Sequence, residues 1–88
     1  MTIELPSGFG ARPATPADGD AILQLIAASE LADDGAVEVD EADMTVGFGR
    51  HGFDPALDSI LVFDGDEPVA WAELYRWRGE ATVRPSHR

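Results

Sequence analysis

The residues that could bind or transform a ligand are unevenly placed along the sequence. The two histidines, His51 and His87, have no partners at metal-ligand spacing, so we expect both to be exposed and no metal to be bound. No cysteine is present, which excludes disulfides and thiol nucleophiles. Guanidinium groups recognise anions, and an anionic ligand is therefore expected near the C-terminus, with a solvated face as the alternative. Four of the six cations lie there: Arg76, Arg78, Arg84 and Arg88.

Composition narrows the class of protein. Six arginines against 17 acidic residues give a net charge of −11, which argues against a general nucleic-acid or anionic-membrane surface. A hydrophobic content of 44% predicts a folded core. The N-terminus lacks the features of a signal peptide, and the longest uncharged helical stretch, residues 21–29, is too short to span a bilayer. The sequence predicts a cytoplasmic protein.

The first half of the chain predicts one strand and two helices. Residues 9–12 alternate and precede a proline, as in a short edge strand. Residues 15–18 read Thr-Pro-Ala-Asp, a strong helix start, and the following apolar residues Ile22, Leu25 and Ile26 share one side of a helix that should end near Ala32. Residues 33–39 predict a solvated acidic loop. A second, weaker helix begins at residue 40, buries Met44 and Phe48, and ends in glycines.

The second half predicts three strands. Residues 59–63 form an apolar run, residues 64–68 supply a turn, and residues 69–77 form a longer strand. In that strand an aromatic stripe of Trp71, Tyr75 and Trp77 shares one face with Glu73. Residues 78–79 then turn the chain into a fourth strand over residues 80–84. The fold class is α+β, in the order β-α-α-β-β-β, with an antiparallel sheet packed on helices.

Two stretches carry a family resemblance. The segment 12–18, Arg-Pro-Ala-Thr-Pro-Ala-Asp, and the final segment 83–88, Val-Arg-Pro-Ser-His-Arg, resemble the GCN5-related N-acetyltransferases. The segments 52–59 and 69–73 look like actinobacterial members with two domains in tandem, similar to mycothiol synthase. The resemblance covers only the N-terminal half of that family's domain. It implies that residues 1–88 are a single incomplete domain with a partial acyl-CoA N-acyltransferase fold, ending just before the pyrophosphate-binding loop.

The resemblance also implies a cosubstrate and the residues that would hold it. The family uses acetyl-CoA to acylate an amine. By resemblance, the backbone around Val83 and Arg84 would pair with the pantetheine arm and polarise the thioester carbonyl, and Arg88 would begin the phosphate-binding motif. A phosphate nest needs glycines and free backbone N–H groups, which the family supplies after this point. The isolated chain is therefore expected to be inactive.

Acyl transfer to an amine needs a base, because a protonated amine cannot attack a thioester. Glu73 and Glu80, on strands near the implied cofactor slot, are the candidates, and a surface position is the alternative for each. The aromatic stripe could line an acceptor pocket, but burial in a core is favoured. The acidic segment 33–43 could recognise a cationic amine, although a solvated loop is the simpler interpretation.

Two functions compete at this point. The first is part of an acetyl-CoA-dependent N-acetyltransferase acting on a small amine. The second is a non-catalytic module: a degenerate half of such a domain, or an acidic interaction domain that completes its sheet with a partner. In the second case the open edge of the last strand would pair with a missing C-terminal half or with another copy of the chain.

Overall fold

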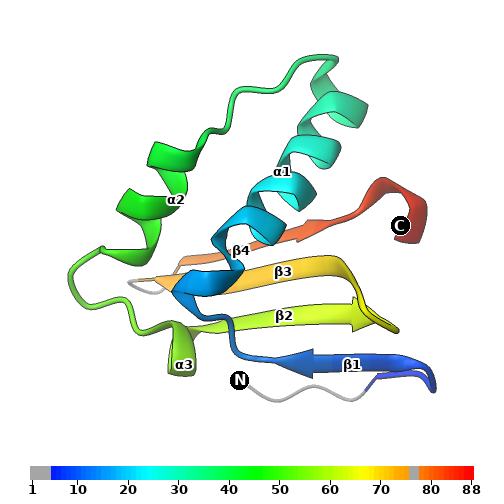
Figure 1. Ribbon diagram of the computed structural model, residues 1–88, viewed down its shortest axis with the longest axis horizontal. Helices are drawn as coiled ribbons and strands as arrows, with labels where there is room; N and C mark the ends of the chain where they lie inside the picture. Colours follow the sequence, from blue (N-terminus) through cyan, green and yellow to red (C-terminus); the bar gives the residue numbers. More distant parts are fainter. Residues whose placement is uncertain (1–4, 76–77) are drawn as a thin grey trace.

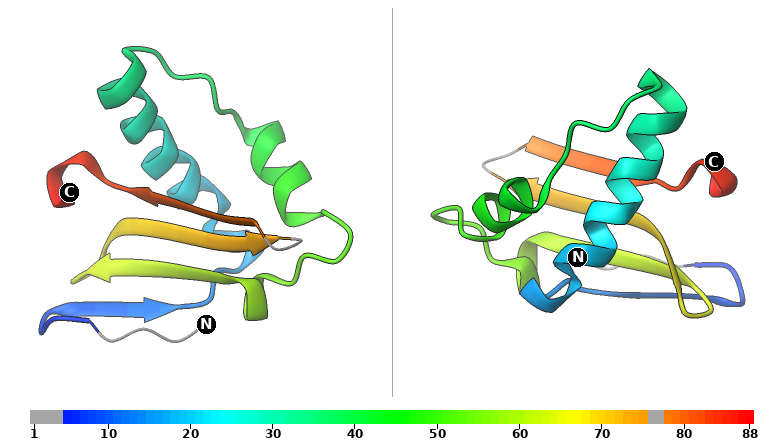
Figure 2. Two further views of the ribbon diagram at one scale, coloured as in Figure 1. Left: turned by 180° about the vertical axis from the view of Figure 1, so that it is seen from behind. Right: turned by 45° about the horizontal axis from the view of Figure 1, so that its top comes forward.

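A computed structural model describes residues 5–75 and 78–88 of the chain. In these residues one antiparallel sheet has the strand order β1-β2-β3-β4, and Figure 1 shows α1 and α2 packed over it. Both helices lie on the same side of the sheet in the two further views (Figure 2). In chain order, the elements are β1 (Phe9–Arg12), the 3-10 turn η1 (Pro16–Asp18), α1 (Gly19–Asp34), α2 (Glu41–Phe48), α3 (Pro55–Asp58), β2 (Ser59–Asp64), β3 (Glu67–Tyr75), β4 (Arg78–Val83) and the 3-10 turn η2 (Pro85–His87).

This order confirms the predicted α+β class, with differences at the ends of elements. The first helix runs two residues past Ala32, to Asp34. Arg78 and Gly79 were predicted to turn the chain, but they belong to β4 and pair with Tyr75 and Leu74. The short helix α3 and the turn η2 were not predicted. Arg76 and Trp77 lie outside the described residues.

Helix ends follow from local chemistry. The Asp40 carboxylate accepts the Asp43 backbone N–H (3.0 Å) at the start of α2, and Asp54 accepts the Ala56 N–H (3.0 Å) at the start of α3. At the end of α1, Gly35 adopts φ 75°, a left-handed conformation that glycine takes without strain, and its N–H donates to the Leu31 carbonyl. None of the helices in the described ranges is long and apolar enough to cross a bilayer.

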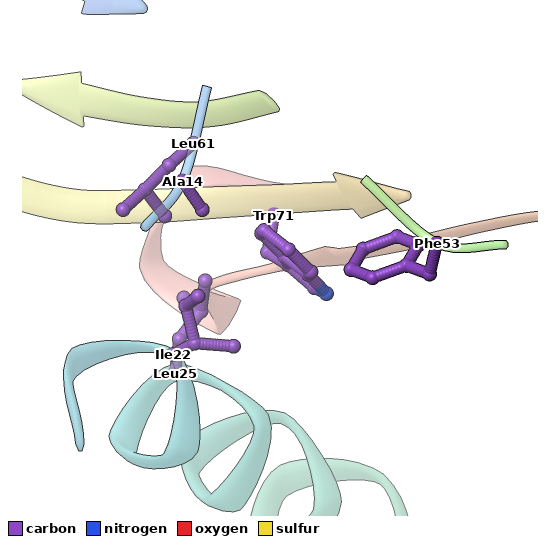
Figure 3. Packing of buried hydrophobic residues seen from close by; sticks show 6 residues of the cluster. All are labelled: Ala14, Ile22, Leu25, Phe53, Leu61 and Trp71. Carbon is purple, nitrogen blue, oxygen red and sulfur yellow. The ribbon is translucent and has the colours of Figure 1, made fainter. Parts of the chain in front are cut away.

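The hydrophobic core lies between α1 and the sheet (Figure 3). Ile22 and Leu25 are fully buried on the sheet-facing side of α1, as predicted, and meet Leu61 and Trp71. Figure 3 shows Phe53 beside Trp71, where the chain enters α3. Partly buried side chains extend the cluster toward α2 and the far end of β3: Ile26, Met44, Phe48, Phe63 and Tyr75.

Sheet register decides which β3 side chains face the helices. Leu61 is opposite Trp71, and Ser59 is opposite Glu73, so these four side chains share the helix-facing side. Ser59 is 1% exposed and fully satisfied: its hydroxyl donates to the Pro55 carbonyl (2.6 Å) and accepts the Ala14 N–H (3.1 Å). The predicted sharing of one face by Trp71, Glu73 and Tyr75 is confirmed.

An ion pair fixes the connection from β1 to α1. Arg12 donates to both Asp18 oxygens, at 2.7 and 2.8 Å, and the Thr15 N–H donates to Asp18 at 2.8 Å. The hydrogen bond from Arg12, assisted by that from Thr15, lowers the pKa of Asp18 from its ordinary 3.8 to about 2. Asp18, not Thr15, therefore provides the side-chain acceptor at this helix start.

The Asp18 pair predicts acid sensitivity. Because the folded pKa is lower than the unfolded one, the unfolded chain binds more protons, and stability is lost as the pH falls from about 5 toward 2. Arg12 is 48% exposed, so solvent screening reduces the loss to about 1 kcal/mol. Urea unfolding of Asp18→Asn and of the wild type, from pH 6 to pH 2.5, should converge at low pH. An unchanged difference would contradict the prediction, and Asp66→Asn, in an exposed turn, is the charge control.

Candidate active site

A cavity of about 230 Å³ opens between α1, α2 and the helix-facing side of β3 and β4. Trp71, buried in the core, forms part of its floor. Its polar lining residues come from α2, from the segment that follows α2, and from β3 and β4. The remaining apolar lining residues are Ile22, Ile26, Met44, Phe48 and Phe53, and the lining residues with polar side chains are Asp43, Arg50, Glu73, Glu80 and Thr82.

The two candidate bases meet in this cavity. Glu73 on β3 and Glu80 on β4 are direct cross-strand partners, so their side chains emerge on the same face. Like charges in this arrangement repel and destabilise a sheet unless a cation compensates them. Sequence analysis placed both residues near the same slot, and the structure brings them together.

Arg50 supplies the compensating charge. Its guanidinium donates to both oxygens of Glu73, at 3.2 and 2.6 Å, and its Nε donates to the Gly47 carbonyl at 2.8 Å. The same group lies 4.5 Å from the ring centroids of Phe53 and Tyr75, two rings that meet each other edge to face at 6.2 Å. The Arg50 and Glu73 side chains are 26% and 13% exposed, respectively. This half-buried, bidentate pair holds Glu73 in one position.

Sequence analysis missed Arg50. The residue lies 23 positions before Glu73, in a glycine-containing segment read only as the end of a helix. Its position in the sequence was the available signal. Arg50 lies apart from the four C-terminal arginines, and a single cation in an acidic region suggests an ion pair with a nearby carboxylate. The predicted aromatic stripe contributes to this position of Arg50. The Tyr75 ring stacks on Arg50, and the Tyr75 hydroxyl donates to the His51 carbonyl (2.9 Å).

Glu80 differs from Glu73 in its surroundings. It is exposed at the mouth of the cavity, and within the described part of the chain no hydrogen bond or ion pair engages its carboxylate. A carboxylate with free lone pairs can accept a proton from a bound nucleophile. Of the two predicted bases, Glu80 has the geometry for direct proton transfer.

The backbone of β4 presents polar groups at an open edge of the described sheet. The Arg84 N–H donates to the Val69 carbonyl at 2.7 Å, so Arg84 faces β3. Bonded and non-bonded pairs alternate in an antiparallel ladder, so the N–H and C=O of Val83 point away from β3. The bond from Arg88 Nε to the Val83 carbonyl (3.3 Å) agrees with this orientation. Thr82 of β4 is one of the cavity-lining residues, so this edge strand borders the cavity.

The two C-terminal arginines predicted to bind the cofactor have partners within the chain. Arg84 contacts Glu67 (3.2 Å) and the Pro68 carbonyl (3.1 Å). Arg88 pairs with Asp33 on α1 and donates to Ser29 at 2.7 Å. The hydrogen bond from Arg88 lowers the pKa of Asp33. These arginines therefore tie the end of the chain to the fold.

The histidines differ from each other. His51 is exposed, as predicted. His87 is only partly exposed, contrary to the prediction, because its Nε2 lies 2.9 Å from Asp64 and its Nδ1 lies 2.8 Å from the Ser86 hydroxyl. In the described ranges, no group of three acidic or histidine side chains is arranged to hold a metal ion.

The acidic segment is more ordered than a solvated loop. Its first two residues, Asp33 and Asp34, are the last of α1. The Glu30 carboxylate accepts the N–H groups of Glu38 and Val39, at 3.4 and 3.0 Å, which fixes the path from α1 to α2. Asp43, at the other end of the segment, reaches the cavity lining.

Comparison with solved structures identifies the fold. The crystal structure of a GCN5-related N-acetyltransferase from Sphaerobacter thermophilus superposes with a TM-score of 0.82 and 30% sequence identity over 94% of this chain. This chain has a partial GCN5-related N-acetyltransferase fold. A proposed acetyltransferase from Pyrococcus horikoshii shares the fold, with a TM-score of 0.71, 16% identity and 100% of this chain covered.

The chain spans 28% and 31% of the lengths of those two structures. No protein-family model and no curated protein matches the sequence. The partial N-acetyltransferase fold expected from the sequence is thus confirmed. The resemblance to tandem-domain proteins is not addressed by these neighbours.

Proposed function

We propose that residues 1–88 are the N-terminal half of a GCN5-related domain in an enzyme that transfers an acyl group from acetyl-CoA to a small amine. One observation carries the proposal: the open edge of β4 adjoins a cavity in which two carboxylates face the same space. A thioester held along that edge would lie beside an amine bound in the cavity. The likeness to tandem, mycothiol synthase-like proteins in residues 52–59 and 69–73 belongs to the same proposal.

The groups of this chain fit one part of the cosubstrate. The outward N–H of Val83 suits an amide of the pantetheine arm or the developing oxyanion of the thioester. Arg84 would contribute by its position in the strand, because its N–H is used by Val69. Arg88 would reach a phosphate only by leaving Asp33, so its proposed phosphate contact competes with an existing ion pair.

The carboxylates would handle the proton. Acetyl-CoA supplies an activated acyl group as a thioester. Glu80 accepts a proton from the bound ammonium, directly or through water, so that a neutral amine is available for attack. Glu73, fixed by Arg50, shapes the site and holds negative charge beside the amine. As the C–N bond forms and the C–S bond breaks, the acyl group moves to nitrogen. The second proton lost by nitrogen neutralises the leaving thiolate, and Glu80 releases the first to solvent.

The test uses the full-length protein that contains this chain. We expect acetyl-CoA binding by calorimetry and amine-dependent release of CoA thiol, measured across a panel of small amines. The 88-residue chain alone should show no turnover, since it corresponds to under a third of each solved neighbour. Failure of the full-length protein to bind acetyl-CoA would refute the proposal.

The open edge of β4 also favours a second candidate, a module that completes its sheet with a partner strand. The outward N–H and C=O groups of Ala81 and the outward N–H of Val83 could pair with another chain. Light scattering after size-exclusion chromatography separates the two functions. A monodisperse monomer would argue against strand pairing between copies, whereas a stable dimer without acetyl-CoA binding would favour it.

A further inference from the structure

The one cation among the described residues that line the cavity already has an acidic partner. Arg50 is the one cation among the described lining residues, against the three carboxylates of Asp43, Glu73 and Glu80. Both terminal nitrogens of Arg50 donate to the two oxygens of Glu73, its Nε donates to the Gly47 carbonyl, and two aromatic rings lie against the guanidinium. Three of the five N–H groups of Arg50 are therefore engaged within the chain, and its charge is paired with Glu73.

This arrangement opposes a ligand that carries a carboxylate. Such a ligand would have to displace Glu73 from Arg50, leaving a carboxylate that is only 13% exposed without its cation and directly across from Glu80. An unpaired, desolvated charge is strongly unfavourable. If Glu73 stays in place, the ligand's carboxylate lies near three acidic groups, and no unpaired cation is present among the described lining residues.

The same arrangement favours a cation with an apolar body. Asp43 and Glu80 have no arginine partner within the described chain, so the described lining keeps a net charge of −2. The lining also has an apolar, aromatic part that includes Phe48, Phe53 and Trp71; the Phe48 ring centroid lies 6.3 Å from that of Phe53 and 6.1 Å from that of Trp71. Apolar walls with a few charged groups at one end orient an amphipathic ligand.

We infer that this cavity selects a small cationic amine with an apolar or aromatic group and no carboxylate, and that the Arg50–Glu73 pair excludes the corresponding amino acid. Acylation of that amine rests on the proposed function. Selective binding does not, because it needs only the cavity described above.

The binding test compares three ligands of one shape. Phenethylamine, phenylalanine amide and phenylalanine share the amine and the ring, and only the last carries a carboxylate. Nuclear magnetic resonance titration of the chain, followed at the Trp71 indole N–H, measures each Kd at pH 6, below the usual amine pKa of about 7.7. The first two ligands should bind at least 10-fold more tightly than phenylalanine. Equal affinity for phenylalanine would overturn the inference.

A matched pair of variants tests the role of the ion pair. Glu73→Gln leaves Arg50 with a neutral partner, so phenylalanine affinity should rise and its disadvantage against phenethylamine should shrink at least 5-fold. Glu67→Gln removes another carboxylate of β3, one that pairs with Arg84 outside the cavity. This variant should keep the wild-type ratio of phenethylamine affinity to phenylalanine affinity. If Glu73→Gln does not fold, the three-ligand series on the wild type still decides the inference.

Activity separates this inference from the proposed function. Selective amine binding without CoA release by the full-length protein would defeat the proposed function and leave the inference intact. Acetylation of phenylalanine as efficiently as phenethylamine would defeat the inference and leave the proposed function intact.

Discussion

Under the proposed function, replacing Glu80 with glutamine is expected to lower kcat of the full-length protein about 100-fold or more at neutral pH. Glutamine keeps the size of the side chain and cannot accept the proton of an ammonium. Glu80 is exposed at the cavity mouth, so the change should leave folding intact. CoA release under saturating acetyl-CoA measures the effect. A more basic solution raises the fraction of neutral amine, and it should restore part of the lost rate.

Glu67→Gln is the control for Glu80→Gln. It makes the same chemical change on the neighbouring strand, away from the cavity lining. Its kcat should stay within about two-fold of the wild type. If Glu80→Gln also keeps wild-type kcat, Glu80 is not the base, and attention shifts to Glu73 or to a group outside this chain.

The largest expected effect on stability comes from Leu25→Ala. Leu25 is fully buried between α1 and the sheet, so truncation removes apolar contacts and leaves a cavity, at a cost of about 3 kcal/mol. A domain of this size has a total stability of only about 5 to 10 kcal/mol. The urea midpoint should therefore fall steeply, as followed by circular dichroism.

Leu31→Ala provides the matched control. Leu31 lies on the same helix but is 57% exposed, so the same chemical change should cost under about 0.5 kcal/mol. Similar losses for both variants would mean that the burial of Leu25 does not determine the cost of truncation. That outcome would contradict the core described here.

The fold was largely predictable because its signals are local. The apolar side of α1, the helix starts at Thr15 and Asp40 and the hairpin of β2 and β3 each follow from neighbours within a few residues. The short helix α3 had the same kind of signal, since Asp54 and Pro55 form a capping residue and a first helical proline. Its four-residue length hid it within a segment that was assigned to no element.

The site was predictable only in part because its key contact is long-range. Alternation along a strand placed Glu73 on the aromatic face, and the hairpin placed Glu80 near it. No periodicity links Arg50 to either residue. The guanidinium of Arg50, which follows α2, reaches the rings of Phe53 and Tyr75 only when α2 has folded onto the sheet. Arg88 likewise reaches Asp33, 55 residues away, through a tertiary contact.

The contacts of Arg50 with two rings and one carboxylate have a consequence for comparing relatives of this protein. Lysine would preserve the charge, but it has neither a planar group to stack on the rings nor a fork to engage both oxygens of one acid. An exchange usually scored as conservative would thus loosen Glu73 and alter which acceptors are admitted. Position 50 is therefore where we expect substrate preference to diverge among otherwise similar sequences.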